Sequence, residues 1–311
     1  MRASDFKFFT DGGNPFGLHF AQIRLCTLFG IPVYLRPSLI FLLLIFATGG
    51  GFVTGIIYAA LLLASIVAHE LAHALVARKF GCPTRDISLS LLGGCASLVD
   101  LPRKPSQEFL VAVAGPAMSF LCGGAAFLLL CAAAKSGGAE GVARYIFDAF
   151  TGADIWVGEH RGVRMFYSEQ FGVPAYLAVR DGAMAIFEAL LYACCSNLML
   201  GAFNLLPGFP MDGGRVFRSI AAKFTTRVRA TWYAMMVGRG TAIMLGIIGA
   251  YRILAGTTWG FVTCLIAFMI WQVGYREYLM VLAEEQGGWS HAHVSPPPYG
   301  GDGGDVHVHR Q

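Results

Sequence analysis

The sequence contains little charge, since Asp, Glu, Lys and Arg make up only 14% of its 311 residues. Soluble globular proteins carry about 25% charged residues, because charge covers the surface that faces water. Hydrophobic residues make up 56%, and the mean hydropathy is +0.59. The shortage of charge argues against a soluble enzyme, a disordered protein and a nucleic-acid-binding protein. It favours a chain that lies in a lipid bilayer.

Two further features are missing. Residues 1–13 are polar and lack an early apolar core, so a secretory signal peptide is not expected there. The eight cysteines show no paired spacing, and several of them lie inside apolar runs where Cys acts as a small hydrophobic residue. A disulfide framework is therefore not expected.

Long apolar runs are abundant, and crossing a bilayer takes a helix of about 20 mostly apolar residues. Six stretches meet this requirement, and together they predict an all-α polytopic membrane protein. The predicted transmembrane helices cover residues 37–52, 55–80, 106–134, 183–206, 231–254 and 257–282.

These spans set the expected domain organisation. Residues 1–36 form an N-terminal segment, 37–282 the membrane domain and 283–311 a flexible tail rich in His, Pro and Gly. Within the membrane domain, 135–182 is a long outer-face segment, for which an interfacial loop and a site for a regulator both stay open. Most Lys and Arg residues lie on the side of the two termini, and positive residues favour the cytoplasmic side. Both termini are therefore expected in the cytoplasm.

Ionisable residues are rare inside the predicted spans, where they are costly unless paired or functional. Three of them, His69, Glu70 and His73, fall in the motif HELAH. Residues four apart on a helix share a face, so both imidazoles can reach one metal ion while Glu70 lies beside it. This is the H-E-x-x-H arrangement of two zinc ligands and a general base. A pair of core histidines without a metal is disfavoured, because burying them in lipid costs solvation energy.

A catalytic zinc site also needs a third protein ligand, and Asp212 is the candidate. It lies in NLLPGFPMDGGR at 204–215, where two prolines end a predicted helix and two glycines permit a tight backbone path. An ordinary loop with a solvated Asp212 is the alternative. Because the second and fourth spans run in the same direction, HELAH and Asp212 are expected at the same side of the membrane.

With both motifs in place, the chain resembles the site-2 proteases, which are intramembrane zinc metalloproteases. The resemblance rests on HELAH and on the pattern N-x-x-P-x-x-P-x-D-G-G from Asn204 to Gly214. The β-like stretch ISLSLLGGCASL at 87–98 and the segment AGPAMS at 114–119 support it, although Ser119 replaces the usual asparagine. Six spans with both termini inside match one branch of that family. Only a short sequence follows Leu282, so neither a PDZ domain nor a pair of CBS domains is expected there.

The resemblance implies an intramembrane endopeptidase that hydrolyses peptide bonds within or near transmembrane segments of membrane-protein substrates. It implies one zinc ion per chain, with Glu70 activating the zinc-bound water and with three zinc ligands: His69, His73 and Asp212. The expected partners are a transmembrane protein substrate and the bilayer, without nucleic acid. The expected location is the inner membrane of a prokaryote.

Two weaker candidates accompany these residues. Asn204 is either a hydrogen-bond donor to the substrate or oxyanion, or a helix-end cap. Gly93 and Gly94 lie in the β-like stretch, which either offers an edge strand to an extended substrate or forms a structural hairpin beside the site.

Rival classes stay open at this point. A zinc transporter or a non-proteolytic membrane scaffold would use the metal site and the tail histidines without hydrolysis, but it would leave Glu70 without a role. A prenyl-protein type of H-E-x-x-H protease takes its third ligand from a helical Glu, and Asp212 argues against it.

Overall fold

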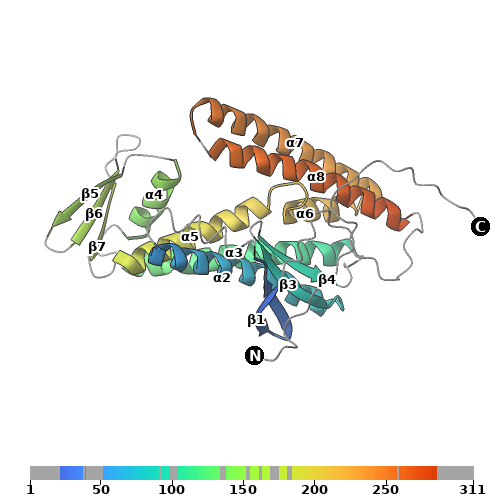
Figure 1. Cartoon of the computed structure of the whole chain (residues 1–311), viewed down its shortest axis with the longest axis horizontal. Helices are drawn as coiled ribbons and strands as arrows, with labels where there is room; N and C mark the ends of the chain where they lie inside the picture. Colours follow the sequence, from blue (N-terminus) through green and yellow to red (C-terminus); the bar gives the residue numbers. More distant parts are fainter. Residues whose placement is uncertain are drawn as a thin grey trace, which may run out of the picture.

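The computed structural model combines long helices with two small sheets (Figure 1). The residues that it describes are 22–37, 39, 52–90, 93–98, 102, 104–133, 138–151, 155–160, 163–168, 175–180, 184–257 and 259–285. The first predicted span, 37–52, lies almost entirely outside these residues. The histidine-containing tail from residue 286 lies entirely outside them.

Five helices in the described part of the chain are long and apolar enough to cross a membrane, and they confirm the other five predicted spans. They are α2 (Phe52–Lys79), α3 (Pro105–Ala133), α5 (Met184–Asn204), α7 (Arg227–Leu254) and α8 (Trp259–Glu285). Large apolar side chains on their outer faces are exposed, among them Leu121, Leu128, Ile247, Phe261 and Phe268. Such surfaces suit lipid rather than water. The chain is a multi-pass integral membrane protein.

Helices α2, α3 and α5 lie side by side and form the centre of the molecule (Figure 1). Helix α2 ends at Lys79 because Gly81 takes a left-handed conformation with a φ of 79°. The N–H of Cys82 then bonds to the carbonyl of Ala77, which closes the last turn. This defined end fixes how far His69 and His73 lie from the terminus of α2.

A four-stranded sheet packs one face against α2. Its order is β1-β2-β3-β4, with β1 (Ile23–Leu28), β2 (Ile31–Leu35), β3 (Thr84–Ser90) and β4 (Gly93–Leu98). The inner face contributes apolar side chains that meet Ile66 and Ala74 of α2: Ile31, Val33, Ile87 and Leu89. The β-like character of 87–98 is confirmed, because β3 and β4 pair antiparallel. Strands β1 and β2 were not predicted.

The connection 135–182 has more structure than a loop. It holds α4 (Gly138–Thr151) and an antiparallel sheet of β5 (Ile155–His160), β6 (Val163–Ser168) and β7 (Ala175–Arg180). Val142 and Ile146 of α4 pack against Leu130 of α3 and Phe187 of α5. This unit lies at the end of the helices away from the four-stranded sheet (Figure 1).

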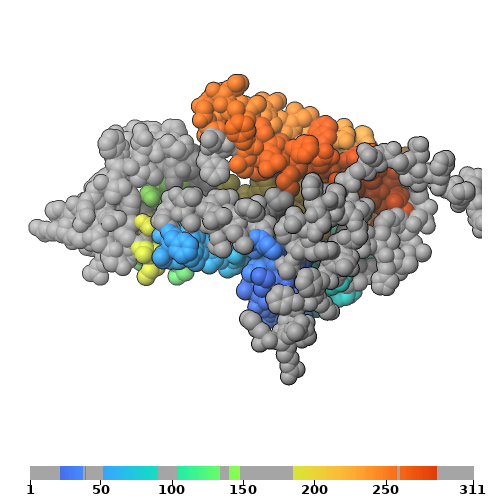
Figure 2. Space-filling view, viewed as in Figure 1, coloured from blue at the N-terminus to red at the C-terminus, as the bar shows by residue number. Residues whose placement is uncertain are grey.

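Helices α7 and α8 form a hairpin at one edge of the molecule (orange in Figure 2). The short helix α6 (Asp212–Ala221) lies between α3 and this hairpin and packs on both α3 and α7. Ala242 of α7 and Ile270 of α8 meet Met211, the residue before α6. The start of α6 is therefore held from two sides.

Candidate metal centre

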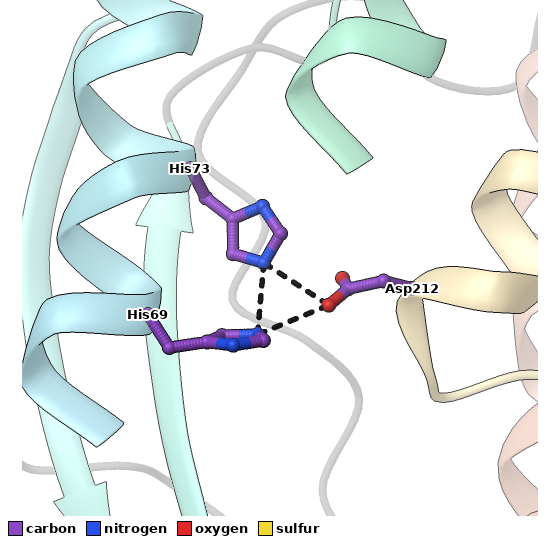
Figure 3. A group of neighbouring side chains, drawn as sticks. All are labelled: His69, His73 and Asp212. Carbon is purple, nitrogen blue, oxygen red and sulfur yellow. Dashed lines mark hydrogen bonds and ion pairs between the residues drawn. The ribbon is translucent and has the colours of Figure 1, made fainter. Parts of the chain in front are cut away.

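Three side chains from two distant segments meet where α2 faces the start of α6 (Figure 3). The Nε2 atoms of His69 and His73 are 3.1 Å apart, and each lies 3.1 Å from Oδ2 of Asp212. The two histidines are buried, and 14% of the Asp212 side chain is exposed. The structure thus brings together the three metal ligands expected from the sequence.

Helix α2 aims both imidazoles in the same direction, because residues four apart lie on one face. Each ring is held from behind through Nδ1. His69 Nδ1 lies 2.9 Å from Ser119 Oγ, and His73 Nδ1 lies 2.6 Å from the carbonyl oxygen of Val111. A carbonyl only accepts hydrogen bonds, so His73 Nδ1 donates. The Nε2 of a neutral His73 is then left with a lone pair that points into the centre.

One face of α3 supplies the surroundings of both rings. Val111, Gly115 and Ser119 follow one another at spacings of four and are all buried. A β-carbon at position 115 would lie 2.1 Å from His73 Nε2 and 2.6 Å from His69 Nε2. Only glycine at this position leaves room for the two imidazoles.

The segment 205–211 brings Asp212 to the histidines by folding back over the start of α6. A β-carbon on Gly213 would lie 2.2 Å from the carbonyl oxygen of Leu206, and one on Gly214 would lie 2.6 Å from the carbonyl carbon of Gly208. Gly208 in turn lies against Gly238 of α7. The two glycines after Asp212 therefore permit the close backbone packing that places its carboxylate.

Asp212 lies outside the spanning helices, and its pKa is shifted by two opposing effects. Burial raises the pKa, but hydrogen bonds from His69 and His73 outweigh burial and hold it below the ordinary range of a carboxyl group. Asp212 is thus a carboxylate at neutral pH.

The donor set fits a zinc ion. A carboxylate oxygen and two imidazole nitrogens are ligands that zinc takes, and zinc–ligand bonds of about 2.0–2.1 Å separate tetrahedral ligand atoms by about 3.3 Å. The observed separations of 3.1 Å are close to this value. The lone pair of a neutral His73 Nε2 and the carboxylate of Asp212 repel each other unless a cation lies between them. That cation is either a proton, which makes the hydrogen bond to Asp212, or a metal ion.

The other predicted site residues have different surroundings. Glu70 follows His69 on α2 and is half-buried. Asn204 donates through Nδ2 to the carbonyl of Leu200, 2.9 Å away in its own helix. Gly93 and Gly94 pair with Ser90 and Leu89, and β4 is the last strand on its side of the sheet.

Sequence reasoning missed several residues around this centre. Val111 acts through its backbone carbonyl, which any residue carries, so no sequence signal marks it. Gly115 lies in the segment AGPAMS, which was noted only for its resemblance. Arg218 was not singled out, yet its side chain is 0% exposed and paired with Glu108 and Glu277.

Comparisons with known proteins agree with this geometry. The family model described as "Peptidase family M50" matches residues 57–246, which include both motifs. The chain belongs to this family. It has the fold of the site-2 proteases, because it superposes on the structure titled "Site-2 Protease from Methanocaldococcus jannaschii" with a TM-score of 0.50 at 24% identity, covering 88% of this chain and 99% of that one.

Relatives of known sequence carry the same kind of name. Zinc metalloprotease MJ0392 of Methanocaldococcus jannaschii is 30% identical over 232 residues, which are 73% of this chain and 54% of that protein. The protein sll0528 of Synechocystis, also named for a zinc metalloprotease, is 33% identical over 271 residues, or 81% of this chain and 58% of that protein. The chain thus spans little more than half the length of these relatives.

Proposed function

We propose that this chain is a zinc-dependent intramembrane endopeptidase of the site-2 protease type, which cleaves within or near transmembrane segments of other membrane proteins. The observation that carries the proposal is that His69, His73 and Asp212 meet at one point in a multi-pass membrane protein. Membership of peptidase family M50 supports it.

The proposed roles follow from the positions of the side chains. His69, His73 and Asp212 bind one zinc ion, while Ser119 and Val111 orient the two imidazoles through Nδ1. When bound, zinc supplies a Lewis acid and a water molecule of lowered pKa. Glu70, next to His69 on α2, accepts the proton of the attacking water and passes it to the leaving amine.

Substrate binding requires an extended backbone, because a helical segment keeps its amides in its own hydrogen bonds. We propose that the edge of β4, including Gly93 and Gly94, pairs with the unwound substrate. Its position supports this, since β3 and β4 pack on α2, the helix that carries both histidines. Asn204 lies at the end of α5 and is proposed to turn from Leu200 to the substrate carbonyl.

The proposed orientation places both termini and the metal centre toward the cytoplasm of a prokaryotic cell. The basic residues Arg78 and Lys79 end α2, the helix that carries the centre, and positive residues favour that side. The unit formed by α4 and β5–β7 would then face outward, where a regulator can bind.

The direct test uses the purified full chain in proteoliposomes with a single-pass substrate labelled on both sides of its transmembrane segment. Glu70→Gln is the matched control, because it keeps the shape of the side chain and both histidines but cannot accept a proton. We expect wild type to cleave, and the variant to bind zinc normally while cleaving about 100-fold to 10,000-fold more slowly.

Two outcomes would contradict the proposal. One is a Glu70→Gln variant that cleaves as fast as wild type. The other is zinc-loaded wild type that cleaves no membrane-inserted substrate but carries zinc across the vesicle membrane, which is the behaviour of a transporter.

A further inference from the structure

Arg218 is the largest fully buried side chain in the described part of the chain, and the proposed chemistry does not use it. Its guanidinium lies between two carboxylates from different helices. Nε is 2.7 Å from Glu108 Oε1 on α3, and Nη1 is 2.8 Å from Glu277 Oε1 on α8. Arg218 and Glu108 are buried and Glu277 is half-buried, and burying charges in this way is costly even when they are paired.

The position of Arg218 on α6 connects it to the candidate metal ligand. Asp212 is the first residue of the same ten-residue helix. The guanidinium carbon also lies 5.0 Å from the ring centre of Phe209, a buried residue of the segment that leads into α6. Arg218 therefore holds both the helix that begins with Asp212 and the backbone just before it.

Glu108 connects Arg218 to the two histidines. It lies on α3 three residues before Val111 and seven before Gly115, so these residues share one face of the helix. That face contacts the imidazoles, since Val111 accepts from His73 and Gly115 leaves room for both rings. The ion pair of Glu108 with Arg218 thus joins the α3 face that holds the histidines to the helix that carries Asp212.

Glu277 adds the hairpin to the same group. The hairpin of α7 and α8 lies at one edge of the molecule (Figure 1). The ion pair of Glu277 with Arg218 joins α8 to α6 directly. A displacement of α8 would therefore pull on Arg218, which lies on the same helix as Asp212.

From these contacts we infer that Arg218 is a positioning residue of the metal centre: with Glu108 and Glu277 it sets the distance between Asp212 and the two histidines. The inference rests on the metal site of the proposed function. Zinc affinity tests it separately, because affinity can be measured even if no substrate is cleaved.

The experiment measures the dissociation constant of zinc by competition with a chromogenic chelator, using the purified full chain in detergent. We expect Arg218→Gln and Glu108→Gln to weaken zinc binding by about 10-fold to 100-fold, as loss of a residue that orients a ligand does. Glu277→Gln keeps the pair of Arg218 with Glu108 and should have a smaller effect. Arg218→Lys keeps the positive charge but cannot contact Glu108 and Glu277 together as arginine does. It should bind zinc more tightly than Arg218→Gln and less tightly than wild type.

Arg239→Gln is the matched control. Arg239 is another arginine at membrane depth, on α7, and it stacks on Trp271 and Tyr275 of α8 without belonging to the group around Arg218. We expect this variant to bind zinc as wild type does. If it weakens zinc binding as much as Arg218→Gln, the effect is a general loosening of the helices and the inference is overturned.

The same set of variants distinguishes a loss of zinc affinity from a failure to fold. Arg218→Gln removes the cationic partner of the buried Glu108 and the half-buried Glu277, and can lower the yield of folded protein. Glu108→Gln changes one oxygen to an amide and keeps the size of the side chain, so it decides the question if Arg218→Gln does not fold. Zinc binding by Glu108→Gln within about twofold of wild type would overturn the inference, whereas a weakened site in protein with an unchanged metal-free melting temperature would support it.

Discussion

Gly115 lies directly against the imidazole of His73: a β-carbon at position 115 would come within 2.1 Å of His73 Nε2. At Gly115, α3 contacts the candidate metal centre through close packing and not through a hydrogen bond. The two rings approach each other to 3.1 Å because α3 presents no side chain at this point.

Gly115→Ala should therefore disrupt the metal centre while leaving the membrane helices intact. The added methyl group displaces both rings, so we expect at least a tenfold loss of zinc affinity and a matching loss of any peptidase activity. Zinc content after dialysis against a metal buffer is the measurement. Gly124→Ala on the same helix is the control, since nothing lies within 4 Å of a β-carbon there. Equal zinc content in both variants would refute the steric role of Gly115.

Ser119→Ala tests the orientation of His69. Without the Ser119 hydroxyl, His69 Nδ1 loses its 2.9 Å partner and the ring gains freedom to rotate. Partners of this kind are worth about 10-fold to 100-fold in metal affinity or activity. Chelator competition should show that loss for Ser119→Ala and none for Ser196→Ala, whose hydroxyl donates to the Ala193 carbonyl of its own helix. An unchanged affinity in Ser119→Ala would mean that packing alone orients His69.

Removing zinc should lower the stability of the protein. A ligand that binds only the folded state stabilises it by about 2.7 kcal/mol when its concentration is 100 times its dissociation constant. Thermal unfolding in detergent, with and without a strong chelator, measures this difference. His73→Ala, which lacks one ligand, should melt at nearly the same temperature under both conditions. A wild-type melting temperature indifferent to chelator and to added zinc would argue against a tightly bound metal.

Gly208→Ala tests the approach of the segment before Asp212 to α7. A β-carbon on Gly208 would lie 2.6 Å from Gly238 Cα, and backbone on both sides leaves little room to adjust. We expect a loss of about 1–3 kcal/mol in the free energy of unfolding, as overpacking usually costs. Denaturant unfolding gives the value. Gly246 lies on α7, as Gly238 does, but nothing lies within 4 Å of a β-carbon there, so Gly246→Ala should show no such loss.

Local sequence patterns predicted the parts of the site that depend on one helix. The spacing of His69 and His73 places both imidazoles on one face of α2 whatever surrounds the helix. The apolar runs predicted the five described spans because hydropathy along the chain alone decides which segments enter lipid. The pairing of Asp212 with the histidines was predicted only through the expected direction of the spans and a resemblance.

Residues that act across helices were not predictable in this way. The group of Arg218, Glu108 and Glu277 was not predicted, because it forms only where Arg218 of α6 meets carboxylates of α3 and α8. The helix and strands within 138–180 were likewise missed, because short segments with mixed polarity are stabilised by tertiary contacts such as that of Val142 with Phe187.

The sequence by itself determined that this chain lies in a membrane and that two histidines of one helix face the same point. Both properties follow from the order of residues along a single segment. The tertiary structure alone decided that Gly115 leaves room for the rings, that Val111 and Ser119 orient them, and that Arg218 joins α3, α6 and α8. These relations depend on distances between helices, which no single segment encodes.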